Sequence, residues 1–107
     1  MINLNDANNI NFLAEVDFIT KKTRFSSSVM LCSILQGSLD KNDTVVLLDA
    51  DKNVITEAIV SVIDYKRNSV EHIEKSDTET NDIGLEFKEI SDKPIENTKF
   101  VCKINAD

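Results

Sequence analysis

Side chains that could carry out catalysis are few in this sequence. The single histidine, His72, stands between Glu71 and Glu74, and no G-x-S-x-G turn or neighbouring cysteine supplies a nucleophile. General acid–base catalysis needs two carboxyl groups in a defined relation, and 19 acidic residues in a chain of 107 single out no such pair. We therefore expect no catalytic site, and we expect His72 to be a solvent-exposed strand residue.

Two groups of acidic residues have the spacing of loose calcium-binding loops. Asp49 with Asp51 forms the first group, and Asp77 with Glu79 and Asp82 forms the second. Neither contains the glycine that an EF-hand loop needs for its sharp turn, so ordinary acidic turns are favoured. The sequence predicts no metal site, and nothing in it points to a cofactor.

The two cysteines, Cys32 and Cys102, lie far apart, each within an apolar run. A buried unpaired cysteine behaves as a small hydrophobic residue, so we expect both to be reduced core residues. A disulfide between an early and a late strand is the alternative and would require export, and the sequence leaves open whether the two thiols are close. Residues Met1 to Asn11 are polar and lack the pattern of a secretory signal, so a cytoplasmic location is expected. No apolar stretch approaches the roughly 20 residues of a membrane-spanning helix.

The net charge is −7, from 12 basic and 19 acidic residues. Acids and bases balance as far as Leu35, so the whole negative excess lies in the rest of the sequence. A surface of that sign repels the phosphates of nucleic acids and of anionic membranes, so neither is an expected partner. Two interpretations stay open: a solvated face that keeps the protein soluble, and a docking surface for a basic protein.

Short apolar runs rich in β-branched residues, separated by polar turns, predict a single all-β domain over residues 1–107, with 1–11 as a polar N-terminal segment. The expected strands cover residues 12–20, 29–35, 44–48, 54–63, 70–73, 83–90 and 99–104. The segment 54–63 also fits a helical stripe, and strand is favoured because Val and Ile dominate it. In the first strand Phe12, Ala14, Val16 and Phe18 alternate with more polar residues. The residues expected in the core are Val29, Leu31, Val46, Leu48, Ile59, Ile83, Leu85 and Val101.

The stretch QGSLDKNDTVVLLD resembles the G-x-L-x-x-G-D-x-V turn in the second domain of elongation factor Tu and related translation GTPases. The matching residues there are Gly37, Leu39, Lys41, Asp43 and Val45, and farther along Ile63, Val70, Ile73, Asp77, Ile83, Gly84 and Leu85. The resemblance covers about residues 12–104 and implies a small closed or nearly closed β-barrel. It assigns structural turn roles to Gly37, Asp43 and Gly84. Glycine's backbone freedom independently suits Gly37 to a strand exit and Gly84 to a strand position where a neighbour needs the space of a Cβ, with an ordinary bulge at Gly84 as the alternative.

The departures from that family are specific. Asn42 stands where the family has a glycine, and Asn tolerates the left-handed backbone conformation better than most residues. Ser76 replaces a second glycine, and about five extra residues follow Asp77. With glycine only at positions 37 and 84, no G-x-x-x-x-G-K-[ST] nucleotide loop can exist. The chain resembles a diverged, stand-alone copy of the barrel.

The resemblance does not extend to the residues that contact RNA. In elongation factor Tu this domain helps to hold the aminoacylated end of tRNA, and the matching places here fall near Asp64, Tyr65 and Asp82. Acids at those places would oppose binding of an anionic RNA end. Tyr65, Lys66 and Arg67 still offer a ring and two cations able to bind a polar ligand, with a solvated hairpin turn as the alternative.

These observations predict a noncatalytic module that docks on another protein of basic character, for example as an immunity or chaperone-like factor. The candidate partner-binding residues are Tyr65, Lys66, Arg67, Asp77, Glu79 and Asp82. An RNA-associated translation module and a small hydrolase with an unrecognised site are the alternatives.

Overall fold

The computed structural model describes residues 10–22, 27–66, 68–75, 83–88 and 95–104, and most of them are in strands. The strands are β1 (Ile10–Lys22), β2 (Ser27–Asp40), β3 (Thr44–Leu48), β4 (Val54–Tyr65), β5 (Asn68–Val70), β6 (His72–Glu74), β7 (Ile83–Phe87) and β8 (Phe100–Ile104). The all-β prediction is confirmed, and segment 54–63, for which a helix was the alternative, lies within β4. The expected loop at 76–82 and the candidate residues Arg67, Asp77, Glu79 and Asp82 lie outside the described residues.

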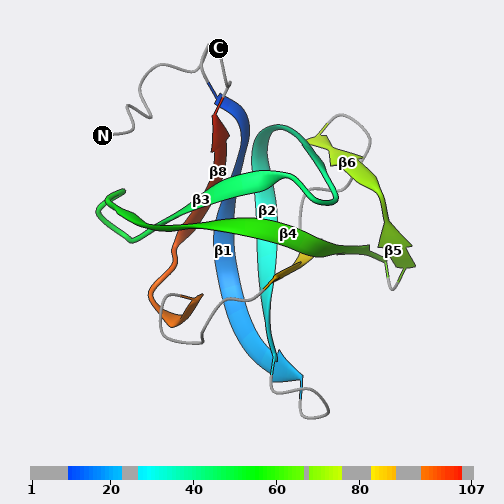
Figure 1. The fold of residues 1–107 in the computed structure, drawn as a ribbon, viewed down its shortest axis with the longest axis horizontal. Coiled ribbons are helices and arrows are strands. Elements are labelled where there is room, and N and C mark those ends of the chain that lie inside the picture. Colours follow the sequence, from blue (N-terminus) through cyan, green and yellow to red (C-terminus); the bar gives the residue numbers. More distant parts are fainter. Residues whose placement is uncertain (1–9, 23–26, 67, 76–82, 89–94, 105–107) are drawn as a thin grey trace.

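Six of these strands close into an antiparallel barrel (Figure 1). The order around the barrel is β1-β8-β3-β4-β7-β2, and β2 pairs with β1 to complete the circle. The remaining two strands lie outside this circle, β5 paired with β4 and β6 paired with β2. The predicted small closed β-barrel is therefore confirmed.

One edge of β4 is shared by three segments, and this arrangement positions the outer strands. β3 pairs with the first half of β4, and β5 pairs with its last three residues. Between them the β2–β3 turn bonds to β4 directly: Asn42 N–H donates to the Val60 carbonyl at 2.8 Å, and Val60 N–H donates to the Asp43 carbonyl at 3.0 Å. Asn42 has the left-handed backbone expected of it, with φ of 75°. The turn thus bridges the gap between β3 and β5 on the outside of the barrel.

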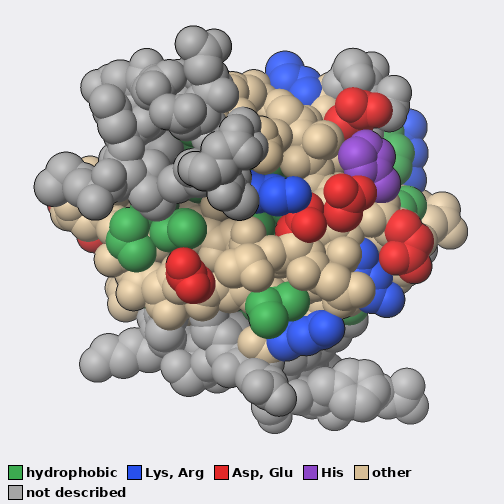
Figure 2. All heavy atoms as spheres, turned by 45° about the horizontal axis from the view of Figure 1, so that its top comes forward, with side chains coloured by type: hydrophobic (Ala, Val, Ile, Leu, Met, Phe, Trp, Pro, Cys, Tyr) green, Lys and Arg blue, Asp and Glu red, His purple; other side chains and the backbone are tan. Residues whose placement is uncertain are grey.

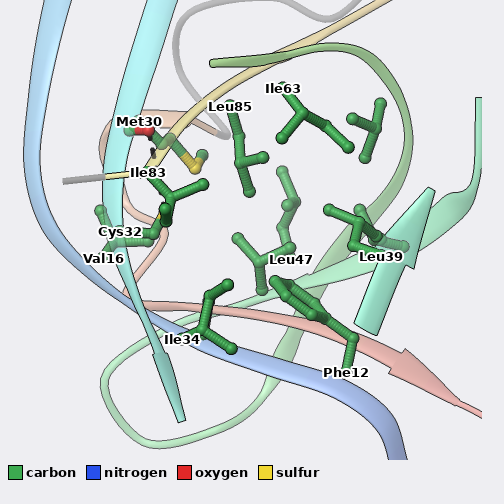
Figure 3. Packing of buried hydrophobic residues seen from close by; sticks show 14 of the residues in the cluster. Phe12, Val16, Met30, Cys32, Ile34, Leu39, Leu47, Ile63, Ile83 and Leu85 are labelled. Atoms are coloured by element: carbon green, nitrogen blue, oxygen red, sulfur yellow. Dashed lines mark hydrogen bonds between the residues drawn. The ribbon is translucent and has the colours of Figure 1, made fainter. Parts of the chain in front are cut away.

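The barrel interior is filled by aliphatic side chains, the sulfur-containing side chains of Met30 and Cys32, and one phenylalanine (Figure 3). Five of the predicted core residues are buried: Val29, Leu48, Ile83, Leu85 and Val101. The predictions for Leu31, Val46 and Ile59 are wrong, since the first two are only partly buried and Ile59 is 41% exposed. In each case the two adjacent residues of the strand are the buried ones, so these three side chains lie on the opposite face of the sheet.

A β-bulge in β1 reverses the face of Phe18. The register between β1 and β2 shifts between Val16 and Phe18, so Asp17 is the extra residue. Alternation would have kept Phe18 on the same face as Val16, but it is 60% exposed and Ile19 packs against the core instead. The predicted alternation therefore holds from Phe12 to Val16 and fails at Phe18.

Both cysteines are buried and free, and they belong to different hydrophobic clusters. Cys32 lies among the barrel interior residues, and burial raises the pKa of its thiol to about 12. Cys102 packs with Ile10 and Leu48 in a second cluster, and burial raises its pKa as well. Their strands, β2 and β8, are separated by β1, to which both pair. The expectation of buried, reduced thiols is confirmed and the disulfide alternative is wrong.

Candidate protein-binding surface

The described part of the predicted tyrosine and lysine site forms the tip of the β4–β5 hairpin. Tyr65 pairs with Asn68, and Lys66 takes the turn with a φ of 50°. The Lys66 ammonium lies 5.4 Å from the centroid of the Tyr65 ring, within the range of a cation–π contact. The Tyr65 ring is thus already in contact with a cation from its own chain.

Asp43 organises the β2–β3 turn through one carboxylate oxygen. The backbone N–H of Asp40 donates to Asp43 Oδ2 at 2.8 Å, and Lys103 Nζ donates to the same oxygen, also at 2.8 Å. The amide of Asp43 donates back to the carbonyl of Asp40 at 3.1 Å, which closes the turn. This side chain therefore links the turn to β8 as well as holding its shape.

Gly37 has the permissive backbone conformation expected of it, but it lies inside β2, so the expected strand exit at this position is wrong. Its φ is 82°, and it pairs with Phe12 at the last step of the β1–β2 ladder. From Ser38 onward β2 pairs with β6. A Cβ at Gly37 would lie 1.8 Å from the Asn11 carbonyl oxygen. The glycine therefore permits the bend at which β2 passes from one partner strand to the other.

Gly84 is opposite Leu31 on one side and Asp64 on the other. A Cβ added there would lie 3.3 Å from the Cβ of Asp64. The missing side chain leaves room for Asp64, whose Oδ1 accepts a hydrogen bond at 3.1 Å from the Ser69 hydroxyl. A Cβ at Gly84 would therefore pack tightly against Asp64, whose side chain joins β4 to β5.

His72 is exposed, as expected, but it lies between two carboxylates that hold it (Figure 2). It pairs with Asp40 in the β2–β6 ladder, and its Nδ1 is 2.6 Å from Asp40 Oδ1. Its Nε2 is 3.7 Å from Glu74 Oε1. The hydrogen bond to Asp40, more than the charges of the two acids, raises the pKa of His72 above its ordinary value of 6.5. Figure 2 shows the purple histidine among red acidic side chains.

The raised pKa predicts a pH dependence with a definite sign. Because the folded chain binds this proton more tightly than the unfolded chain, protonated His72 stabilises the fold below pH 6.5. That contribution is lost as the pH rises through the folded-state pKa. An NMR titration of the imidazole should give a pKa above 6.5, and Asp40→Asn should lower it toward that value. A wild-type pKa at or below 6.5, or no change in Asp40→Asn, would contradict the assignment.

A small hollow of about 40 Å³ lies where the β2–β3 turn meets β4 and β5. It is lined by Lys41, Ser61, Val62, Ile63, Ser69, Val70 and Glu71. The backbone on its rim is fixed, since Lys41 N–H donates to the Glu71 carbonyl at 2.9 Å. Among the described residues, no side chain pairs with the carboxylate of Glu71. Sequence reasoning did not find this hollow, because it depends on three segments that are distant along the chain.

No family model matches the chain, and none of the curated proteins is significantly similar to it. Within the described ranges, no three His, Cys, Asp or Glu side chains are grouped so as to hold a metal ion. None of the helical segments in that part of the chain has the length and apolarity needed to cross a bilayer.

Proposed function

We propose that this protein is a noncatalytic binding module that docks on a basic protein through the surface formed by β5, β6 and the β2–β3 turn. The observation that supports it is the gathering of Asp40, Glu71 and Glu74 at this surface, all with exposed or partly exposed side chains. The described cations beside these acids are Lys41, on the rim of the adjoining hollow, and two lysines already engaged with the turn, Lys103 with Asp43 and Lys88 with Asn42. A surface of that charge attracts basic proteins over a distance and repels nucleic acid.

Within this proposal, the protein neutralises or chaperones its partner, as an immunity protein does for a basic enzyme. We also propose a relationship to the second domain of elongation factor Tu, supported by the closed barrel of six strands and by the ordered sequence matches around Gly37 and Gly84. An experimental structure whose strands connect in a different order from that domain would contradict the relationship.

The experiment is capture of a partner from the native host, followed by rapid-mixing kinetics with the identified protein. Attraction between exposed charges is screened over about 8 Å at physiological ionic strength. We therefore expect the association rate to fall about tenfold or more between about 0.05 M and about 0.5 M salt, with a much smaller change in the dissociation rate. An association rate that does not depend on salt would contradict the proposal.

The candidate acids that follow β6 in the sequence provide a variant with a defined control. Changing Asp77, Glu79 and Asp82 to their amides should slow association more than it speeds release. The control changes three exposed acids elsewhere on the barrel, Asp51, Glu57 and Glu96, to their amides and so removes the same charge. An equal effect of both triple variants would mean that net charge alone acts. Tighter binding of RNA by the first variant in a gel-shift assay would favour the RNA-associated alternative instead.

A further inference from the structure

The hollow between the β2–β3 turn and the β4–β5 hairpin is lined by both apolar and polar residues. Its walls include Val62, Val70 and the buried Ile63. The hydroxyl groups of Ser61 and Ser69 lie on β4 and β5. Such a lining suits a side chain that has a hydrocarbon stem and a polar end.

The neighbouring carboxylates are already engaged, which sets Glu71 apart. Asp40 binds His72 at 2.6 Å, and Asp64 accepts the Ser69 hydroxyl at 3.1 Å. Glu71 is exposed and, within the described part of the chain, no hydrogen bond or ion pair uses its carboxylate. It can therefore take a new cationic partner without losing an existing one.

We propose that this hollow is an anchor site for one arginine or lysine side chain of the partner, with the Glu71 carboxylate as its counterion. This proposal rests on the proposed function and identifies the site at which one side chain of the basic protein binds. The stem of the incoming side chain packs on Val62 and Val70, and its charged end lies at Glu71 beside the serine hydroxyls.

The size of the hollow fits this occupant. Its volume of about 40 Å³ is room for roughly three water molecules, comparable to a guanidinium group. Sites for nucleotides and other small-molecule ligands are usually ~300 Å³ or larger. The hollow is therefore suited to the end of a side chain and not to a cofactor.

Lys41 also lines the hollow, and its charge allows a test of whether the group bound there is a cation or an anion. No ion pair joins Lys41 to Glu71 among the described residues, so neither charge is neutralised by the other. If a cation occupies the hollow, Lys41 opposes it and Glu71 attracts it. If an anion occupies the hollow, the two effects are reversed.

The experiment titrates the full chain with small probes and follows its backbone amide signals by NMR. The cationic probes are N-acetyl-arginine methylamide and N-acetyl-lysine methylamide. N-acetyl-citrulline methylamide is the uncharged match for arginine, and inorganic phosphate is the anionic probe. We expect one or both cationic probes to shift the signals of Ser61, Ser69 and Glu71, and citrulline to bind more weakly. Glu71→Gln should weaken the cationic probe by about 3- to 10-fold, and Lys41→Gln should strengthen it.

Glu57→Gln is the matched control. Glu57 is also an exposed acidic residue, but it lies in the part of β4 that pairs with β3, opposite Val46, and does not line the hollow. The substitution should leave probe binding unchanged. Equal loss of probe affinity in Glu57→Gln and Glu71→Gln, equal binding of citrulline and arginine, or preferential binding of inorganic phosphate through Lys41 would each overturn the anchor site.

If the captured partner still shows salt-dependent association that Glu71→Gln leaves unchanged, the anchor site fails while the proposed function stands. If the probes bind as expected but no basic partner is captured, the proposed function fails alone.

Discussion

Replacing Gly37 by alanine is expected to destabilise the protein by about 3 kcal/mol or more. The glycine has a φ of 82°, a left-handed conformation that costs an L-residue roughly 1 to 2 kcal/mol. The added Cβ would also lie 1.8 Å from the Asn11 carbonyl oxygen, so the backbone of β1 or β2 must move. That movement would disturb the point at which β2 leaves β1 and pairs with β6. Urea denaturation followed by circular dichroism measures the effect.

The matched substitution is Gly84→Ala, at the other glycine of the chain. There the new Cβ meets Asp64 Cβ at 3.3 Å, which a shift of a few tenths of an ångström relieves. Alanine is also favoured over glycine in a strand by about 0.5 to 1 kcal/mol. We therefore expect Gly84→Ala to remain within about 1 kcal/mol of the wild type. Equal stability losses at both positions would show that the close contact at Gly37 is not the cause.

The positions of the strands along the sequence could be predicted because the patterns that mark them are local. Runs of β-branched residues end at turn residues such as Asp40 to Asp43, and this pattern depends on a few neighbouring positions only. The same holds for Asn42, whose left-handed conformation follows from its place in a tight turn. Closure of the barrel was added by the family resemblance and could not be derived from these local patterns.

The direction of individual side chains could not be predicted with the same success. Alternation assumes an uninterrupted strand, and the bulge at Asp17 sends Phe18 outward and Ile19 inward. For Ile59 the sequence offers apolar residues on both faces of the strand, and pairing with β3 and β7 decides which face is inside. Register of this kind is set by contacts between distant segments.

The candidate surface depends on distant pairing even more strongly. His72 meets Asp40, a residue 32 positions away, only because β6 pairs with the end of β2. In the sequence, the acidic residues near His72 are Glu71 and Glu74, and nothing there indicates that Asp40 is its hydrogen-bond partner. The hollow beside Glu71 likewise requires the β2–β3 turn to reach β4 and β5.

Shortening Leu85 to alanine is expected to cost about 2 to 5 kcal/mol. Leu85 has no exposed surface and lies in β7 opposite Met30 of β2 and Ile63 of β4, both of which are also buried. Its truncation leaves a cavity that the closed barrel cannot collapse without moving paired strands. Urea denaturation should therefore show a lower midpoint with a similar slope.

Ile59→Ala supplies the comparison, because the same sequence pattern predicted both side chains to be buried and only Leu85 is. Because Ile59 is 41% exposed, shortening its side chain removes fewer packing contacts than shortening Leu85. We expect the free energy of unfolding to fall by about 1 kcal/mol or less. The two variants remove side chains of equal carbon number from the same barrel, so the difference between their midpoints measures burial and not composition. A larger loss at Ile59 than at Leu85 would mean that β4 presents its other face to the core, contrary to its register with β3 and β7.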